Sequence, residues 1–450
     1  MRDTIAGIAT AMGEGGVAIV RLSGGDAVAL FARVFRAARR VPPYEDHRLM
    51  YGHVVDETGA PVDEAMGVVM YAPHTYTRED VCELHTHGGY AAAATAMRLL
   101  TRLGARPAEP GEFTRRAFMN GRIDLTQAEA VMGVIGARSQ AALKSEEALL
   151  SGGASRFIRQ AQDKLIALIA GVEAHLDYPD EIDETEATAG LREGLAALVA
   201  ALSGAVDERG ARILREGLRV ALCGRPNAGK STLFNALLGE ERAIVTEVPG
   251  TTRDVLEGSF SLDGLNVQLL DTAGLRESED TVERIGVERA RAAVAQADAA
   301  LLVVDASKPL DADEQALLAA NLGCPCAVLL NKEDAQPVLT LADVAAHTAH
   351  APILTLSAKT GQGLAQVRAY LASQAKLPRE GMLTHERHMA AAREAAARLT
   401  QALAALEAGV PLDVAAVDLR EALWSLGRIT CESVDDRLLD EIFSTFCVGK

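Results

Sequence analysis

The chain has 450 residues, of which 49% are hydrophobic and 24% charged, as in a soluble protein large enough for two or three domains. Its 45 basic and 62 acidic residues give a net charge of −17, which excludes nucleic-acid binding by bulk attraction. Any RNA partner would need a local basic surface or another subunit. We find no membrane-length apolar run, no signal peptide and no CxxC pair, and therefore expect a cytoplasmic protein without membrane association.

The first segment alternates short strand-like runs with turns. Val17 to Leu22 and Glu64 to Tyr71 are short apolar runs bounded by Gly or Asp, which favours strands. A helical stretch is predicted over Asp26 to Arg40. The pattern indicates a small α+β domain over residues 1–118.

Helical periodicity then takes over. From about Asp124 to Glu216, apolar residues recur at helical spacing with an interruption at Tyr178-Pro179-Asp180, and the helical stretch resumes over Leu191 to Leu214. The same texture returns after about residue 376, in a tail too short for a comfortable core of its own. The economical interpretation is one discontinuous helical domain; two independent helical appendages are the alternative. The predicted segments are 119–213 and 377–450 for this domain and 214–376 for an inserted domain.

The inserted segment alternates strands and helices. Its apolar runs are continuous, which is typical of strands covered on both faces of a doubly wound α/β sheet. The predicted strands are Leu218 to Leu222, Val267 to Leu270, Ala300 to Val304, Ala327 to Leu330 and Ile353 to Leu356.

Gly224 to Ser231 match the phosphate-loop pattern GxxxxGK[ST]. The motif follows a strand and opens a helix, which is the context that it requires. Its glycines let backbone N–H groups fold around phosphate. Lys230 would neutralise the β- and γ-phosphates, and the Ser231 hydroxyl would be a Mg²⁺ ligand.

Three further motifs follow strands in order. Asp271 would hold the magnesium through water, and Gly274 would offer its N–H to the γ-phosphate. Asp334 can accept from N1 and N2 of guanine, a paired donor edge that adenine lacks, so the motif favours GTP over ATP. The loop of Ser357, Ala358 and Lys359 would close over the base. The predicted GTP contacts in these four motifs are Asn227, Ala228, Gly229, Lys230, Ser231, Thr232, Asp271, Thr272, Ala273, Gly274, Asn331, Lys332, Asp334, Ser357, Ala358 and Lys359.

Other blocks carry a family resemblance. Gly250-Thr251-Thr252-Arg253-Asp254 resembles the switch sequence of Era/TrmE-like GTPases. Phe446-Cys447-Val448-Gly449-Lys450 resembles the FCxGK ending of the MnmE (TrmE) family, the GTPases of tRNA wobble-uridine modification. The blocks Pro110 to Gly121 and Asp124 to Ala130 resemble the same family. The resemblance covers essentially the whole chain.

The resemblance implies an architecture and an activity. The family has an N-terminal folate-binding domain that dimerises and a helical domain interrupted by a Ras-like P-loop G domain. The homodimer works with a flavin-dependent partner, MnmG, in a hetero-oligomer. Together they install a carboxymethylaminomethyl or aminomethyl group at C5 of the tRNA wobble uridine. The one-carbon unit comes from a tetrahydrofolate, as the 5-formyl or 5,10-methylene form.

The resemblance also implies how GTP is cleaved. Leu275 stands where Ras-like proteins carry a water-orienting glutamine, so another group must act. In the family's pattern, Asn227 would coordinate K⁺ together with oxygens of Thr246, Val248 and Thr251, and closure of two G domains would complete the site. Glu283 would act on the water; taken alone, it reads as a solvated helix-start charge. The loop residues added as GTP contacts are Thr246, Glu247, Val248, Pro249, Gly250, Thr251 and Thr252, with Thr252 on magnesium.

For folate, the resemblance implies contacts from Arg21, Glu83, Arg122 and Lys450, with Arg122 where the family often has lysine. A surface charge or local salt bridge is the alternative for each.

Cys447 is either a nucleophile beside Lys450 or a core residue of an apolar tail. His85 and His87 alternate on one strand face, but two histidines without a third ligand usually bind no metal.

Other classes of function remain. A ribosome-assembly GTPase acting as an RNA-binding switch would carry an RNA-binding module, such as a KH domain, after the G domain. The tail here is helical and has no GxxG loop. A purely regulatory GTPase scaffold is the third interpretation.

Overall fold

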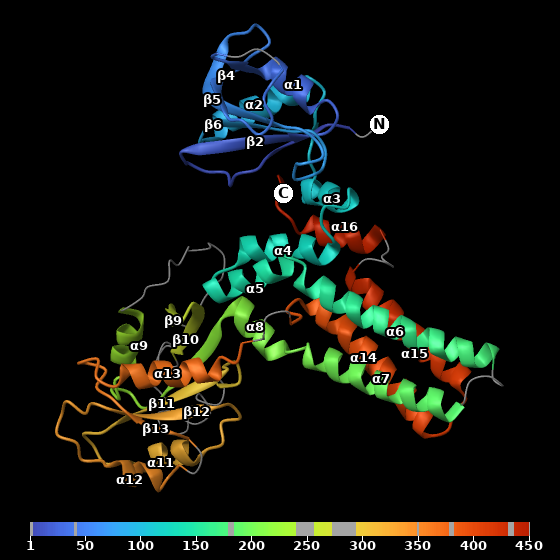
Figure 1. Ribbon diagram of the computed structural model, residues 1–450. Coiled ribbons are helices and arrows are strands. Elements are labelled where there is room, and N and C mark those ends of the chain that lie inside the picture. Colours follow the sequence, from blue (N-terminus) through green and yellow to red (C-terminus); the bar gives the residue numbers. More distant parts are fainter. Residues whose placement is uncertain are drawn as a thin grey trace. The chain divides into compact units, whose positions relative to one another are not determined.

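The computed structural model describes residues 3–39, 43–178, 184–239, 256–271, 294–348, 351–377, 382–430 and 436–449. The chain forms two compact units, whose helices and strands are drawn in Figure 1. The first contains residues 1–132, 149–199 and 394–450, and the second contains residues 133–148 and 200–393. Among the described helices, none is both long and apolar enough to cross a bilayer.

The first unit contains a seven-stranded sheet in the order β3-β4-β5-β6-β2-β1-β7. Alternate residues of β2 are buried, among them Val20 and Leu22, and the core that they enter includes Phe31 of α1 and Leu100 of α2. The elements are β1 (Ile5–Ile8), β2 (Val17–Ser23), α1 (Ala27–Val34), β3 (Phe35–Ala37), β4 (Met50–Val55), β5 (Pro61–Met70), β6 (Val81–His87), α2 (Tyr90–Arg102) and β7 (Arg106–Pro107).

One predicted element of this domain was wrong in extent. The helix expected over Asp26 to Arg40 ends at Val34, and the chain continues as β3. Phe35 has extended backbone angles and pairs with Val54 of β4. Pairing with a distant strand therefore overrides the local helical pattern.

Helices from both sides of the insertion pack together in the first unit. Residues such as Ile158, Leu165 and Val172 form the buried face of α6 (Gly153–Asp177), which packs along α15 (Leu412–Thr430). The guanidinium of Arg420 donates to Glu173 at 2.9 Å, joining the two helices. The discontinuous helical domain predicted from the sequence is confirmed. The other helices of the two predicted segments are α4 (Leu125–Gly136), α7 (Glu184–Gly204), α14 (Glu386–Glu407) and α16 (Asp436–Ser444), together with α5 (Gln140–Leu150), which lies mostly in the second unit; α3 (Glu112–Met119) precedes them.

After α16 the chain returns to the seven-stranded sheet of the first unit. Phe446 is buried in a cluster with Leu125 and Phe443. Val448 forms an antiparallel bridge with Pro110. Gly449 has a φ of 101°, and a Cβ there would lie 2.3 Å from the carbonyl oxygen of Ile8. Only glycine permits this close approach.

The second unit contains a six-stranded sheet in the order β13-β12-β11-β8-β10-β9. All neighbours are parallel except β9, which is antiparallel to β10. One face packs against α9 and α13, and the other against α11 and α12. The elements are α8 (Glu208–Glu216), β8 (Leu218–Cys223), α9 (Lys230–Gly239), β9 (Leu256–Leu262), β10 (Leu265–Asp271), β11 (Ala299–Asp305), α11 (Ala312–Ala319), β12 (Cys326–Asn331), α12 (Leu341–Ala345), β13 (Ile353–Thr355) and α13 (Leu364–Gln374).

The five predicted strands are present, and two features differ from the sequence-based expectation. The strand β9 was missed, because its sequence LEGSFSL is an edge strand with alternating polar residues. The helical stretch predicted over Leu191 to Leu214 is broken into α7 and α8. The Asp207 carboxylate accepts the N–H of Gly210 at 2.9 Å and so caps the start of α8.

The buried carboxylate of Asp298 ties α8 to the sheet. It is 4% exposed, pairs with Arg212 of α8 and accepts the backbone N–H of Arg219 in β8 at 3.0 Å.

We expect Asp298→Ala to lower the free energy of unfolding of the second unit by about 3 kcal/mol, because it leaves a buried donor and a cation without their acceptor. Urea unfolding of the full chain measures this. The exposed Asp313 provides the control, since Asp313→Ala should change stability by only about 0.5 kcal/mol.

Candidate functional site

The predicted nucleotide motifs meet at one edge of the second unit's sheet. The strands β8, β10, β11, β12 and β13 are parallel, so their carboxyl ends lie on the same side. A crevice at the carboxyl ends is where open α/β sheets bind ligands. This edge carries the loop from Gly224, Asp271, Asp305, Asn331 and the loop from Ser357.

The phosphate loop is shaped by three residues with positive φ. These are Gly224 (142°), Asn227 (64°) and Gly229 (99°). A Cβ on Gly229 would lie 2.2 Å from the Asn331 amide nitrogen, so the loop passes too close to β12 for any side chain there. The Lys230 ammonium is buried and donates to the carbonyl oxygens of Gly224 (2.7 Å) and Arg225 (2.8 Å). The ammonium is therefore held inside the loop by backbone carbonyl oxygens, at the place where the motif puts a cation next to phosphate.

Asn331 joins the two loops that flank it. Its amide Nδ2 donates to the carbonyl oxygen of Ala228 at 2.9 Å, and its Oδ1 accepts the N–H of Ala358 at 2.9 Å. The side chain is 1% exposed, so both hydrogen bonds are shielded from water. Asn331 thus positions the phosphate loop and the predicted base loop, and both ends of its amide are already used in doing so.

The Asp334 carboxyl group is held in the ionised form, which guanine recognition needs. The Ser357 hydroxyl donates to its Oδ1 at 2.7 Å, and this hydrogen bond holds the pKa of the Asp334 carboxyl below its usual value. Asp334 is exposed, whereas Ser357 is buried. An ionised, exposed carboxylate with a fixed orientation can accept two parallel N–H donors.

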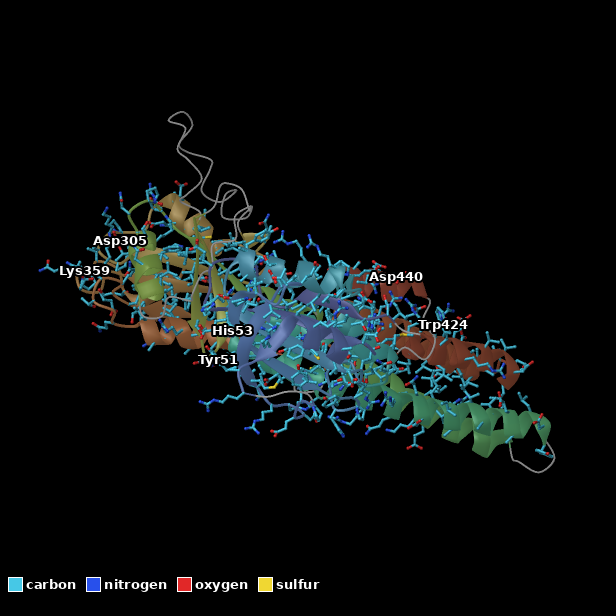
Figure 2. The ribbon with its side chains drawn as sticks, turned by 90° about the horizontal axis from the view of Figure 1, so that it is seen from above. Tyr51, His53, Asp305, Lys359, Trp424 and Asp440 are labelled. Atoms are coloured by element: carbon cyan, nitrogen blue, oxygen red, sulfur yellow. The ribbon has the colours of Figure 1, made fainter. Side chains whose placement is uncertain are left out.

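Asp305 is a site residue that sequence reasoning missed (Figure 2). It ends β11, and its carboxylate accepts from the Lys332 ammonium at 2.6 Å and the Ser307 hydroxyl at 2.6 Å. Burial raises the pKa of Asp305, but these donors outweigh it and hold that pKa below its usual value. Lys332 also donates to the carbonyl oxygen of Asn227 at 2.8 Å. The run AALLVVD, which ends at Asp305, resembles VQLLD, which ends at Asp271, and this similarity could have identified Asp305 from the sequence.

Two exposed hydroxyls open α9, those of Ser231 and Thr232, directly after the buried Lys230. Hydroxyl oxygens beside a phosphate loop suit Mg²⁺, so these residues fit the ion that the motif implies. Of Asp271, the backbone is described, at the end of β10. The predicted residues that lie outside the described part of the chain are Thr246, Glu247, Val248, Pro249, Gly250, Thr251, Thr252, Thr272, Ala273, Gly274, Glu283 and Lys450.

A second constellation lies in the first unit. Arg21 of β2 stands directly opposite Glu83 of β6, and its Nε donates to Glu83 Oε1 at 2.8 Å. His85 Nε2 lies 3.0 Å from the other carboxylate oxygen. Burial raises the pKa of Glu83, yet His85 and Arg21 outweigh burial and hold the pKa below its usual value. Arg21 also donates to the carbonyl oxygen of Gly449 at 3.4 Å.

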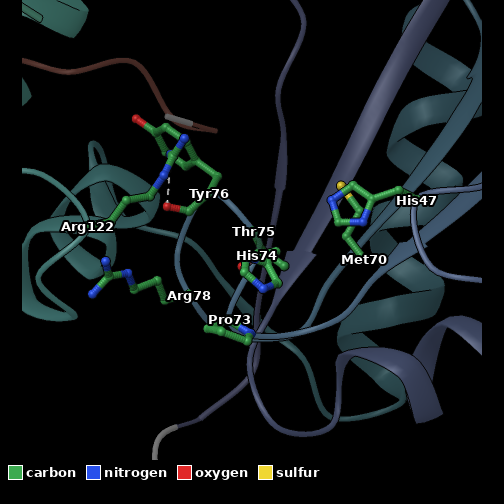
Figure 3. A pocket seen from close by; sticks show the side chains of 8 residues that line it. All are labelled: His47, Met70, Pro73, His74, Thr75, Tyr76, Arg78 and Arg122. Carbon is green, nitrogen blue, oxygen red and sulfur yellow. Dashed lines mark hydrogen bonds between the residues drawn. The ribbon is translucent and has the colours of Figure 1, made fainter. Parts of the chain in front are cut away.

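The ring of Tyr76 connects this pair to Arg122. The Arg21 and Arg122 guanidinium carbons lie 5.9 Å and 4.8 Å from the ring centroid, and Arg122 donates to the Tyr76 carbonyl oxygen at 3.1 Å (Figure 3). An open cavity of about 510 Å³ is lined by Tyr76 and Arg122 together with Arg78, His47 and His74. Arg21 and Arg122, two of the predicted folate residues, thus share one aromatic ring, and a third, Glu83, is joined to them by its ion pair with Arg21.

The block from Pro110 to Gly121, which contains α3, packs against Arg21 and Tyr76. Arg116 is buried and donates to the carbonyl oxygen of Asp3 (2.8 Å) and to Glu79 (3.1 Å), which ties α3 to the residues just before β1 and to the loop before β6, while its bond to Glu112 (3.0 Å) lies within α3. The same helix places Phe113 5.7 Å from the Arg21 guanidinium carbon and Thr114 2.9 Å from the Tyr76 hydroxyl. Its charged residues are therefore structural, and its apolar and hydroxyl residues reach the site.

Cys447 and the histidines differ in their environments. The interpretation of Cys447 as a core residue was wrong: Phe446 fills the core and Cys447 is exposed. His87 pairs with Asp63 at 2.8 Å, and His85 lies against Glu83. Across the described residues, no group of three potential metal ligands occurs.

Comparisons with known proteins cover the whole chain. The family model described as the MnmE helical domain matches residues 125–447, and the one described as the GTP-binding protein TrmE N-terminus matches residues 4–122. The tRNA modification GTPase MnmE of Chloroflexus aurantiacus is 45% identical over 100% of both chains. The proteins of the same name from Symbiobacterium thermophilum and Lactobacillus delbrueckii subsp. bulgaricus are 44% and 42% identical over 100% of this chain and 99% and 98% of theirs.

The two hydrogen bonds of the Asn331 amide, here called the Asn331 brace, can be tested by two substitutions of this residue. Asn331→Ala removes both hydrogen bonds, and we expect it to weaken binding of a fluorescent GDP analogue about 100-fold, at roughly 1 to 1.5 kcal/mol per bond. Asn331→Asp keeps the acceptor for Ala358 but sets a carboxylate against the Ala228 carbonyl, so it should bind no better than the alanine variant. Asn321→Ala, in an exposed turn, is the control. Unchanged nucleotide affinity in Asn331→Ala would show that the brace is dispensable.

Proposed function

The chain belongs to the MnmE family of tRNA modification GTPases, and we propose that it hydrolyses GTP in its second unit to drive modification of the tRNA wobble uridine. The observation that carries the GTPase assignment is the carboxyl edge of the sheet. There the Asn331 amide holds the phosphate loop and the base loop together. The helical tail after this unit gives no support to a ribosome-assembly factor with an appended KH-type module.

Different residues at this edge of the sheet would bind the phosphates, the base and the magnesium ion of GTP. Lys230, now bonded to two loop carbonyls, would turn its ammonium to the β- and γ-phosphates. Asp334 would accept from guanine N1 and N2, which excludes adenine. Ser231, with Thr252 and Asp271, would hold Mg²⁺, which neutralises phosphate charge when bound.

We further propose that hydrolysis depends on K⁺ and on facing G domains in a homodimer. Asn227 is exposed in the phosphate loop, where Lys332 holds its backbone carbonyl, and its side-chain oxygen could bind a monovalent cation. Thr246, Val248 and Thr251 would supply the remaining oxygens. Glu283 would orient the attacking water in place of the absent glutamine.

The cation proposal predicts a salt-specific rate. GTP turnover by the wild type should be at least tenfold faster in KCl than in NaCl at equal ionic strength, because a bound cation stabilises developing phosphate charge. Asn227→Ala should remove this difference without unfolding the chain. Glu283→Ala should lower turnover about 100-fold while GTP still binds. Equal turnover in both salts contradicts the potassium site, and full turnover in Glu283→Ala contradicts its assigned role.

The first unit would bind a tetrahydrofolate, as the 5-formyl or 5,10-methylene form. The ionised Glu83 suits the paired N–H donors of a pterin ring. Arg122 and Arg78 line the adjacent cavity and suit the carboxylates of a folate tail. The one-carbon unit, with a flavin-dependent partner (MnmG), would build the carboxymethylaminomethyl or aminomethyl group at uridine C5. Cys447 and Lys450 would lie near that chemistry, and tRNA modification by Cys447→Ser tests the thiol.

Folate binding is tested by titration calorimetry with 5-formyltetrahydrofolate. We expect Arg122→Ala to weaken binding about tenfold or more, because it removes a charged partner from the cavity. Arg115→Ala provides the control, since Arg115 pairs with Asp440 on the other side of the same block. Absence of heat with the wild type would remove folate from the proposal and leave the GTPase assignment intact.

A further inference from the structure

The carboxylate of Glu83 is held from two sides. Arg21 Nε donates to one oxygen at 2.8 Å, and His85 Nε2 lies 3.0 Å from the other. The side chains of Arg21, Glu83 and His85 are 14 to 19% exposed, so water has limited access to the carboxylate. Because the two donors act on different oxygens, they fix both the position and the rotation of the carboxylate plane.

This arrangement leaves a defined acceptor pattern. A carboxylate offers about four lone-pair positions, two on each oxygen. Arg21 takes one on Oε1 and His85 takes one on Oε2. One position on each oxygen therefore remains, which is the number that a ligand edge with two parallel N–H donors requires.

The surroundings of His85 favour this role over others. Its neighbours on the flanking strands are Ile19 of β2 and Met66 of β5, which are apolar. Glu83 is the polar partner that the described residues provide. Because Glu83 is held ionised, the nitrogen facing it must carry the proton. Nε2 of His85 is thereby the donor to Glu83.

We propose that His85 is a positioning residue of the folate site, whose Nε2–H orients the Glu83 carboxylate to receive the 2-amino and N3–H donors of a pterin. The role rests on the proposed folate binding. His85 itself contacts no ligand in this assignment. It acts on pterin recognition through Glu83, and it complements Arg21, which also bonds to the Gly449 carbonyl.

The test compares two variants with two ligands. His85→Phe keeps the ring and removes the donor, and His85→Gln restores an amide N–H near the position of Nε2. Each is titrated calorimetrically with 5-formyltetrahydrofolate and with its 2-desamino analogue, which lacks one of the two donors. Thermal unfolding of each variant reports whether the sheet is intact.

For the parent folate we expect His85→Phe to bind about tenfold more weakly than the wild type and His85→Gln to stay within about threefold. For the 2-desamino analogue the loss in His85→Phe should shrink to about twofold or less, because the oriented acceptor pair is no longer used. Equal losses for both ligands, or no loss in His85→Phe, would overturn the positioning role. A wild type that binds neither ligand overturns the folate proposal itself, and this role with it.

Discussion

The nucleotide site depends on one buried amide. Asn331 stands at the end of β12, and its two hydrogen bonds hold the phosphate loop on one side and the base loop on the other. Both partners of Asn331, the Ala228 carbonyl and the Ala358 N–H, are backbone groups, so the two hydrogen bonds do not depend on the side chains at these positions. The close approach also explains Gly229, because a side chain there would occupy the space of the amide. Lys332 and Asp305 extend the same brace to the next strand end.

The sequence predicted this edge well because local rules govern it. Continuous apolar runs mark the covered strands, and the phosphate-loop pattern is short and contiguous. The brace itself could not be predicted, since its partners lie 103 and 27 residues from Asn331. The strand β9 was missed because an edge strand needs no apolar run. The helix after Asp26 was overextended because pairing of Phe35 with Val54 is a tertiary effect.

The constellation around Tyr76 follows a different logic. Its residues come from separate strands, from a loop and from the segment after α16, and no short motif joins them. Resemblance to a family suggested Arg21, Glu83 and Arg122 as contacts of one ligand, but it did not say how they contact one another. The geometry supplies one: Tyr76 provides an aromatic surface that both arginines share, and α3 fixes that surface from beneath. His85 entered the sequence analysis as a weak metal candidate and is found instead beside a carboxylate.

The contact between Arg21 and Gly449 has a consequence for biosynthesis. The two residues are 428 positions apart, and Gly449 fits only because nothing projects from it toward Ile8. The seven strands of the first unit's sheet all lie before residue 108, whereas the carbonyl group that Arg21 contacts belongs to Gly449. The hydrogen bond between Arg21 and Gly449 therefore forms only after residue 449 has been made, and a product truncated before that residue lacks it.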